Sequence, residues 1–131
     1  MKEWFNKIPV EDMVSWRRHI HENPELSFEE YKTAAFVEEK LRSFGNIEIV
    51  KPTETSVLGI LRGAKEGKTI LLRADMDALP MQEEGDLPFK SKVKGVAHTC
   101  GHDTHTAMLL AAAKVLSELK DSLHGTVKFI F

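Results

Sequence analysis

The sequence predicts an α/β domain in which helices pack against a sheet. Segments with helical spacing of apolar residues alternate with short apolar, β-branched runs, in the order helix, helix, strands, loop, helix, strand. Helices that connect the strands of one sheet are typical of layered α/β domains. The length of 131 residues, 42% of them hydrophobic, suits one globular domain with a buried core.

The first two helices have boundaries that the sequence marks. Apolar spacing predicts a helix over Val10–Glu22, which Asn23-Pro24 ends. The run Ser27-Phe28-Glu29-Glu30 has the pattern of a capping box, with Ser27 as the N-cap and Glu30 three residues later. The helix that this box opens is expected to end at Gly45, a residue type favoured directly after a helix.

The predicted strands are short and apolar. They are Ile47–Val50, Val57–Leu61, Thr69–Arg73 and Thr126–Phe131, and the turn-prone stretches Lys51-Pro52 and Gly63–Gly67 separate the first three. A long loop from about Met76 to Thr99 and a helical run from Ala107 to about Leu119 precede the last strand. Loops of this length are often functional. Because the chain ends on an apolar strand, we expect it to be a piece of a longer protein.

Composition and charge exclude several classes of protein. The net charge is −2, and basic residues are interleaved with acidic ones, so neither nucleic acid nor an anionic membrane is expected as a partner. A single cysteine cannot form an internal disulfide, which favours a reducing compartment, the cytoplasm. The N-terminus lacks the apolar core of a signal peptide, and no apolar run is long enough to span a bilayer.

The most informative stretch runs from Ala97 to Thr106. It contains the only cysteine, three of the six histidines and an acid. Cys100 and His102 are separated by Gly101, which permits a tight turn at the start of a helix, and a thiolate with an imidazole suits a transition metal. Two alternatives remain open: an inert cysteine beside polar helix caps, or a cysteine nucleophile with a histidine base.

Two further histidines, His98 and His105, flank this pair. On one continuous helix they would share a face with His102, but Gly101 indicates that the helix begins only after it. We therefore expect that the three histidines do not bind one ion. His98 and His105 are predicted to be hydrogen-bonded supporting or capping groups.

Two carboxylates, Asp75 and Asp77, follow the apolar strand residues Ile70-Leu71-Leu72. Residues i and i+2 of an extended chain point the same way, so both side chains can meet at the carboxyl end of the strand, where ligands of α/β sheets usually bind. Carboxylates there can bind a metal, orient a ligand imidazole or tune a bound water. The alternative is turn chemistry before Pro80.

The remaining polar and aromatic residues are predicted to be structural. A solvated C-terminal helix end is expected for His19, His21, Glu22 and Glu25, because histidine is favourable near the negative end of the helix dipole. Packing anchors are expected at Trp4, Trp16 and Phe28.

Three segments, taken in order, resemble a known family. They are Arg17–Thr33, Arg73–Pro80 and Gly95–Ala107, the last with Cys100-Gly101-His102-Asp103 at its centre. Together they resemble the N-terminal part of the aminoacylase-like metallo-amidohydrolases. That family includes hippurate hydrolases, N-acetyl-amino-acid deacetylases and indole-acetyl-amino-acid hydrolases, and it is related more distantly to carboxypeptidase G and other di-zinc peptidases. The likeness covers almost the whole chain and departs at Ala97, Thr99 and Thr104.

The resemblance implies both a fold and a set of site residues. The fold is a mixed sheet flanked by helices, with residues 1–131 as the incomplete N-terminal portion of a di-zinc-peptidase-like catalytic domain. Cys100 and His102 are implied to be ligands of a centre of two divalent metal ions, for which Zn, Mn, Ni and Co all suit. Asp77 is assigned to the catalytic residues as a supporting carboxylate. Four residues are expected to surround the ligands without binding the metal themselves: Asp75, His98, Asp103 and His105.

The resemblance also implies what else the family uses. Its general-base glutamate, its other histidine ligands and a lid domain that mediates homodimerisation follow the strand matching Thr126–Phe131. The expected function is metal-dependent hydrolysis of N-acyl amino acids or short peptides. We expect the chain alone to be inactive, because it supplies two ligands where a stable site has at least three. The alternatives are a non-catalytic stand-alone domain, whose last strand pairs with a partner, and a thiol enzyme that uses Cys100.

Overall fold

Four strands form one mixed sheet in the computed structural model, which describes residues 3–131. They are β1 (Ile47–Val50), β2 (Leu58–Arg62), β3 (Lys65–Arg73) and β4 (His124–Ile130), in the order β1-β2-β4-β3. The β1–β2 and β2–β4 pairs are antiparallel, whereas β3 and β4 are parallel. The predicted α/β fold with a mixed sheet is confirmed.

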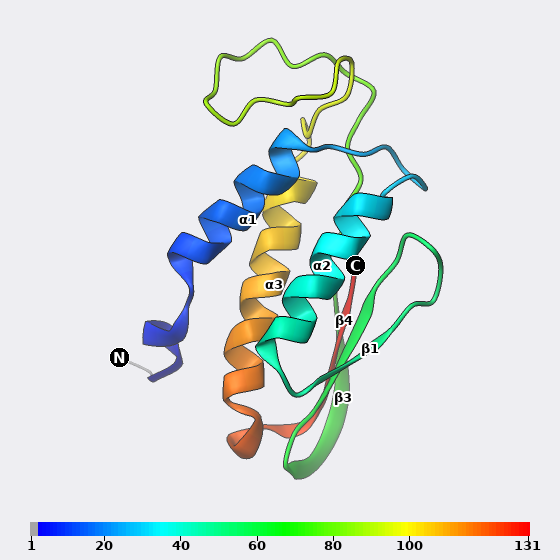
Figure 1. The fold of residues 1–131 in the computed structure, drawn as a ribbon. Helices are drawn as coiled ribbons and strands as arrows, with labels where there is room; N and C mark the ends of the chain where they lie inside the picture. The colour runs from blue at the N-terminus through cyan, green and yellow to red at the C-terminus, as the bar shows by residue number, and fades with distance from the viewer. Residues whose placement is uncertain (1–2) are drawn as a thin grey trace.

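Three α-helices pack beside the sheet (Figure 1). They are α1 (Val10–Glu22), α2 (Tyr31–Phe44) and α3 (His102–Glu118), with short 3₁₀ helices η1 (Glu3–Lys7) and η2 (Lys120–Ser122). Helix α3 contacts both α1 and α2. Leu110 of α3, Leu41 of α2, Leu61 of β2 and Phe129 of β4 are fully buried together in the core between the helices and the sheet. None of the helices in the described part of the chain is both long enough and apolar enough to cross a membrane.

The parallel pair determines where functional residues can gather. Parallel neighbours need a crossover connection, and the segment that contains α3 provides it between β3 and β4. Ile70 of β3 pairs with Val127, and Leu72 pairs with Phe129, so both strands run towards the same edge of the sheet. Helix α3 starts near that edge, after the long loop that follows β3 (Figure 1).

Strand β3 is longer than the sequence predicts. It begins at Lys65 rather than Thr69, so the second half of the predicted turn over Gly63–Gly67 is wrong. Its first residues lie against the start of β4 at Gly125, which has φ +80°. A Cβ atom on Gly125 would overlap the carbonyl oxygen of Lys68, so glycine is what permits the two strands to approach here.

The predicted capping box is also wrong. Helix α2 starts at Tyr31, and neither Ser27 nor Glu30 supplies a side-chain cap. The Glu25 carboxylate accepts hydrogen bonds from the backbone N–H of Lys32 (3.1 Å) and of Thr33 (2.6 Å) instead. A carboxylate brought back from the preceding turn therefore satisfies the free N–H groups of α2 and the positive end of its dipole.

Of the three residues predicted to be packing anchors, one is buried and two are exposed. Trp16 is 8% exposed and belongs to the core, as predicted. Trp4 is 45% exposed and Phe28 is 84% exposed, so the prediction is wrong for both. Phe28 lies in the turn before α2 and has a positive φ of 66°.

Candidate metal centre

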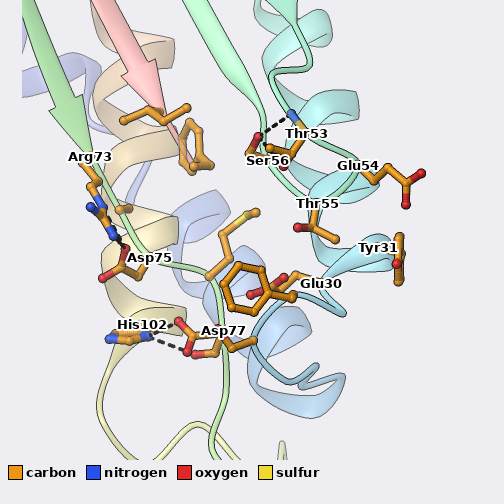
Figure 2. Close-up of a pocket in the computed structure, with 16 residues that line it drawn as sticks. Glu30, Tyr31, Thr53, Glu54, Thr55, Ser56, Arg73, Asp75, Asp77 and His102 are labelled. Carbon is orange, nitrogen blue, oxygen red and sulfur yellow. Dashed lines mark hydrogen bonds and ion pairs between the residues drawn. The ribbon is translucent and has the colours of Figure 1, made fainter.

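A hollow of about 750 Å³ lies at the carboxyl ends of β3 and β4. Asp75, Asp77 and His102 line one side of it, and Tyr31 and Thr55 lie on the opposite side (Figure 2). The chain reaches this position because Asp75 and Asp77 follow β3 directly, while His102 is the first residue of α3. The edge of the sheet predicted from the sequence is thus the edge where these side chains meet.

The centre of the arrangement is a hydrogen-bonded pair of His102 and Asp77. His102 Nδ1 lies 3.0 Å from the Asp77 carboxylate Oδ1 and 3.0 Å from the Asp77 carbonyl oxygen (Figure 2). Since both neighbours are acceptors, Nδ1 carries the ring proton and donates it. The lone pair of Nε2 is therefore available to a metal, and a carboxylate on the other nitrogen is the usual companion of a ligand histidine.

Cys100 lies two residues before His102 and has an exposed, unbridged thiol. Gly101 between them has φ +120° and directly precedes α3 as its N-cap. This conformation is one that L side chains rarely adopt, so glycine is needed for the turn that joins the cysteine to the helix. The predicted turn between the two candidate ligands is confirmed, and the helix starts directly after Gly101.

The two predicted carboxylates have different partners. Asp77 contacts His102, whereas the Asp75 carboxylate accepts a hydrogen bond of 2.8 Å from Nε of Arg73. Asp75 contributes in another way, because its carbonyl oxygen accepts a 3.0 Å hydrogen bond from the hydroxyl of Thr106 on α3. Both acids line the hollow, but only Asp77 is in contact with a candidate ligand.

Asp103, the second residue of α3, points into the protein interior, and its side chain is 1% exposed. Its Oδ2 accepts a hydrogen bond from Arg17 Nε (2.8 Å) and lies 2.7 Å from His21 Nδ1. Burial by itself raises the pKa of Asp103, but the hydrogen bond from His21 and the charge of Arg17 outweigh it and lower the pKa. Asp103 is therefore a buried carboxylate that anchors the first turn of α3.

His98 is buried at 7% exposure, and the described residues offer a hydrogen-bond partner to neither ring nitrogen. Burial lowers its pKa to about 4, and the nearby Asp103 carboxylate opposes that shift only in part. His98 is thus neutral at pH 7. The prediction that His98 is hydrogen-bonded is wrong, because no donor or acceptor of the described residues lies within hydrogen-bond distance of its buried ring nitrogens.

His105 is exposed on α3, with its ring centroid 6.1 Å from that of His102. A continuous helix from His102 onwards explains this separation, since residues three apart lie on one face. Within residues 3–131, no three or more histidine, cysteine, aspartate or glutamate side chains are arranged to hold a metal ion.

A cluster of polar side chains on the interior side of α3 was not predicted from the sequence. It consists of Arg17, His21, Glu83 and Asp103. His21 was assigned to a solvated helix end, and that assignment is wrong, because the residue is only 4% exposed. Its ring lies between the carboxylates of Asp103 and Glu83, residues that are distant in the sequence. A signal was present in the spacing of Arg17 and His21, which share one face of α1 at i, i+4.

A known protein family matches the part of the chain that contains the candidate site residues. The model of peptidase family M20/M25/M40 matches residues 71–131. The chain is 55% identical, over 92% of its length, to the N-acyl-L-amino acid amidohydrolase of Geobacillus stearothermophilus, and it covers 32% of that protein. It is 52% identical, over 95% of its length, to thermostable carboxypeptidase 2 of Saccharolobus solfataricus, and it covers 33% of that protein.

A solved structure gives the same result for the fold. The chain matches the Bacillus subtilis YXEP protein, described as a dinuclear metal-binding peptidase of the M20 family, with a TM-score of 0.87 and 45% identity. The match covers 91% of this chain and 33% of that one. The chain thus spans about one third of the length of the relatives that it matches.

Proposed function

Because these comparisons confirm the resemblance to the N-terminal part of the aminoacylase-like metallo-amidohydrolases, we propose that this chain supplies part of the metal centre of such an enzyme. The substrates proposed for the longer protein are N-acyl amino acids or short peptides, as the names of the two relatives suggest. Residues 1–131 are proposed to be the N-terminal portion of its catalytic domain, since they span about one third of those relatives.

The observation that carries the proposal is the contact between His102 and Asp77. The 3.0 Å hydrogen bonds to Nδ1 fix the tautomer and the ring orientation and direct Nε2 away from Asp77. A histidine held only for structural reasons would more often satisfy both ring nitrogens within the protein. No hydrogen bond is made by His102 Nε2 to the described residues, and the ring lines the hollow.

The donor set of the site fits a metal ion of borderline softness. Cys100 and His102 would hold it, since a thiolate and a neutral imidazole suit Zn, Mn, Ni or Co. When bound, such an ion activates a water molecule and polarises the amide carbonyl of the substrate. Asp77 acts through His102 as a positioning residue, while Asp103 holds the first turn of α3 from behind.

Two ligands are fewer than a stable protein site uses, so the proposal includes a division of the centre. The remaining ligands and the general base are proposed to come from residues that follow this portion in the longer protein. We therefore expect residues 1–131 alone to bind metal weakly and to lack hydrolytic activity.

The test compares residues 1–131 with the longer protein that contains them. Metal content and the hydrolysis of N-acetyl- and N-benzoyl-amino acids are measured for both, with Cys100→Ser and Thr99→Ser as the site variant and its neighbouring control. We expect the longer protein to contain metal and to hydrolyse at least one substrate class. We expect C100S to lose both properties and T99S to keep them. A longer protein that contains no metal and has no activity would contradict the proposal.

A further inference from the structure

The loop between β3 and α3 ends at Cys100, two residues before His102, so whatever holds this loop also holds the cysteine. Its middle, residues 81–96, has no regular secondary structure, and a bridge between Leu79 and Ala97 closes it at the base with two backbone hydrogen bonds of 3.0 Å. Figure 1 shows this loop extending past the end of α1, away from the sheet. Its position is therefore set by contacts with α1 rather than by the sheet.

Several groups at the end of α1 contact the loop. The backbone N–H of Lys92 donates a 2.9 Å hydrogen bond to the carbonyl oxygen of Glu22, the last residue of α1. The guanidinium groups of Arg17 and Arg18 lie 4.8 and 5.0 Å from the centre of the Phe89 ring. These contacts are partly exposed, as is the ion pair between the side chains of Lys92 and Glu22. A further contact from α1 to the loop is more enclosed.

That contact is made by His21, whose side chain is 5% exposed. Its Nε2 lies 3.0 Å from the Glu83 carboxylate in the loop, and its Nδ1 lies 2.7 Å from the Asp103 carboxylate in α3. The other oxygen of Glu83 accepts a 2.7 Å hydrogen bond from the backbone N–H of Ser91, across the loop. One imidazole thus links the helix, the loop and the start of the ligand-bearing helix.

Both carboxylates are ionised at neutral pH. Burial raises the pKa of Glu83, but the hydrogen bonds from the Ser91 backbone and from His21 outweigh it and lower the pKa. The pKa of Asp103 is lowered as well. Two ionised carboxylates therefore lie within hydrogen-bond distance of the two nitrogens of one ring.

Two further rings pack around His21. The ring of His98 is 6.3 Å away, centre to centre. The edge-on ring of Phe89 lies 5.5 Å away. Arg17 shares Asp103 with His21, so two side chains of α1 hold the same carboxylate at the start of α3. Lys90 is a further, weaker positive neighbour of Glu83.

We propose that His21 is a positioning residue that, through its hydrogen bonds to Glu83 and Asp103, holds the cysteine-bearing loop against helix α3. The loop-holding role stands on geometry alone. Its consequence for metal binding rests on the proposed function of Cys100 and His102.

The variant Glu83→Gln keeps the shape and the hydrogen-bonding groups of this residue. Its amide can bond to Nε2 of His21 while its oxygen still accepts from the backbone N–H of Ser91. The exposed neighbour Glu84→Gln is its control.

The positioning role is tested by amide hydrogen exchange of residues 81–99, corrected for intrinsic rates. We expect His21→Gln to lower protection by about tenfold or more, since a charge-assisted hydrogen bond is lost on one side. E83Q should retain protection, and His19→Gln, an exposed position on the same helix, should leave it unchanged. Unchanged protection in H21Q would overturn the positioning role. If H21Q does not fold, loss of protection in E83Q would overturn it.

Metal titration of the longer protein separates the two proposals. If both hold, H21Q weakens Zn²⁺ binding by about tenfold or more and E83Q does not. If the wild type binds no Zn²⁺, the proposed function fails while the hydrogen-exchange results on His21 remain valid. Zn²⁺ binding that H21Q leaves unchanged would overturn the link from His21 to the metal centre.

Discussion

Two consecutive residues at the start of α3, His102 and Asp103, point to different sides of the helix and have different partners. His102 faces the hollow and is oriented by Asp77, whereas Asp103 faces the interior and is held by Arg17 and His21. Successive residues of a helix point about 100° apart, so the first turn can carry a ligand on one side and its anchor on the other. A histidine paired with a carboxylate therefore occurs twice, once at the hollow and once in the interior.

The pair of His102 and Asp77 can be tested by mutation. Asp77→Ala removes the acceptor that fixes the proton on Nδ1, so we expect the metal affinity of the longer protein to fall about 10- to 100-fold. Asp75→Ala is the matched control, because that carboxylate is paired with Arg73 instead. Isothermal titration with Zn²⁺ measures both variants. Equal losses in the two variants would contradict the role assigned to Asp77.

His98 gives a prediction about pH and stability in the metal-free chain. Its pKa is lowered from 6.5 to about 4 in the folded state, so below about pH 6.5 the unfolded chain binds the proton more readily. Folding stability is therefore lost as the pH falls from about 6.5 to 4, by roughly 3 kcal/mol at the lower end. Denaturant unfolding at several pH values measures this loss.

The control for that experiment is His98→Gln, which has no charge to gain. We expect it to flatten the pH dependence in this window, whereas the exposed His105→Gln should behave like the wild type. A wild-type stability that does not change between pH 6.5 and 4 would show that burial does not exclude the proton from His98.

At the scale of elements, patterns that depend on near neighbours could be predicted. Helix α1 and strand β1 have the predicted bounds. Helix α3 starts directly after Gly101, as the glycine indicates, and so begins before the apolar run at Ala107 from which it was predicted. The cap of α2 could not be predicted from local spacing. Ser27 and Glu30 have the spacing of a capping box, but the carboxylate of Glu25 accepts the hydrogen bonds from the N–H groups at the start of the helix. Local spacing identifies groups able to cap a helix and leaves open which of them is near enough.

The cap of α2 is tested by comparing two substitutions. Glu25→Ala leaves the backbone N–H groups of Lys32 and Thr33 without their carboxylate, so we expect a loss of about 1–2 kcal/mol in the free energy of unfolding. Ser27→Ala should change it by less than about 0.5 kcal/mol, because the exposed hydroxyl caps nothing. Urea unfolding measures both. A larger loss for S27A than for E25A would restore the capping box.

For the whole molecule, the sequence predicts the edge of the sheet where the candidate site lies. It does not predict the buried polar contacts that hold the neighbouring loop and helix in place. Asp77 and His102 are each placed by a short-range pattern, one after a strand and one at a helix start. The partners of His21 are 62 and 82 residues away in the sequence, so no local pattern reveals that this histidine is buried between them. Long-range polar contacts of this kind depend on the final packing of α1, the loop and α3.

The central claim is that Cys100 and His102 bind metal together, and absorption spectroscopy of the longer protein loaded with Co²⁺ tests it most directly. A cysteine thiolate bound to Co²⁺ gives a charge-transfer band that oxygen and nitrogen ligands do not give. The predicted result is a thiolate band in the wild type that disappears in Cys100→Ser and persists in Thr99→Ser. Co²⁺ bound without that band, or a band that survives in C100S, would contradict the claim.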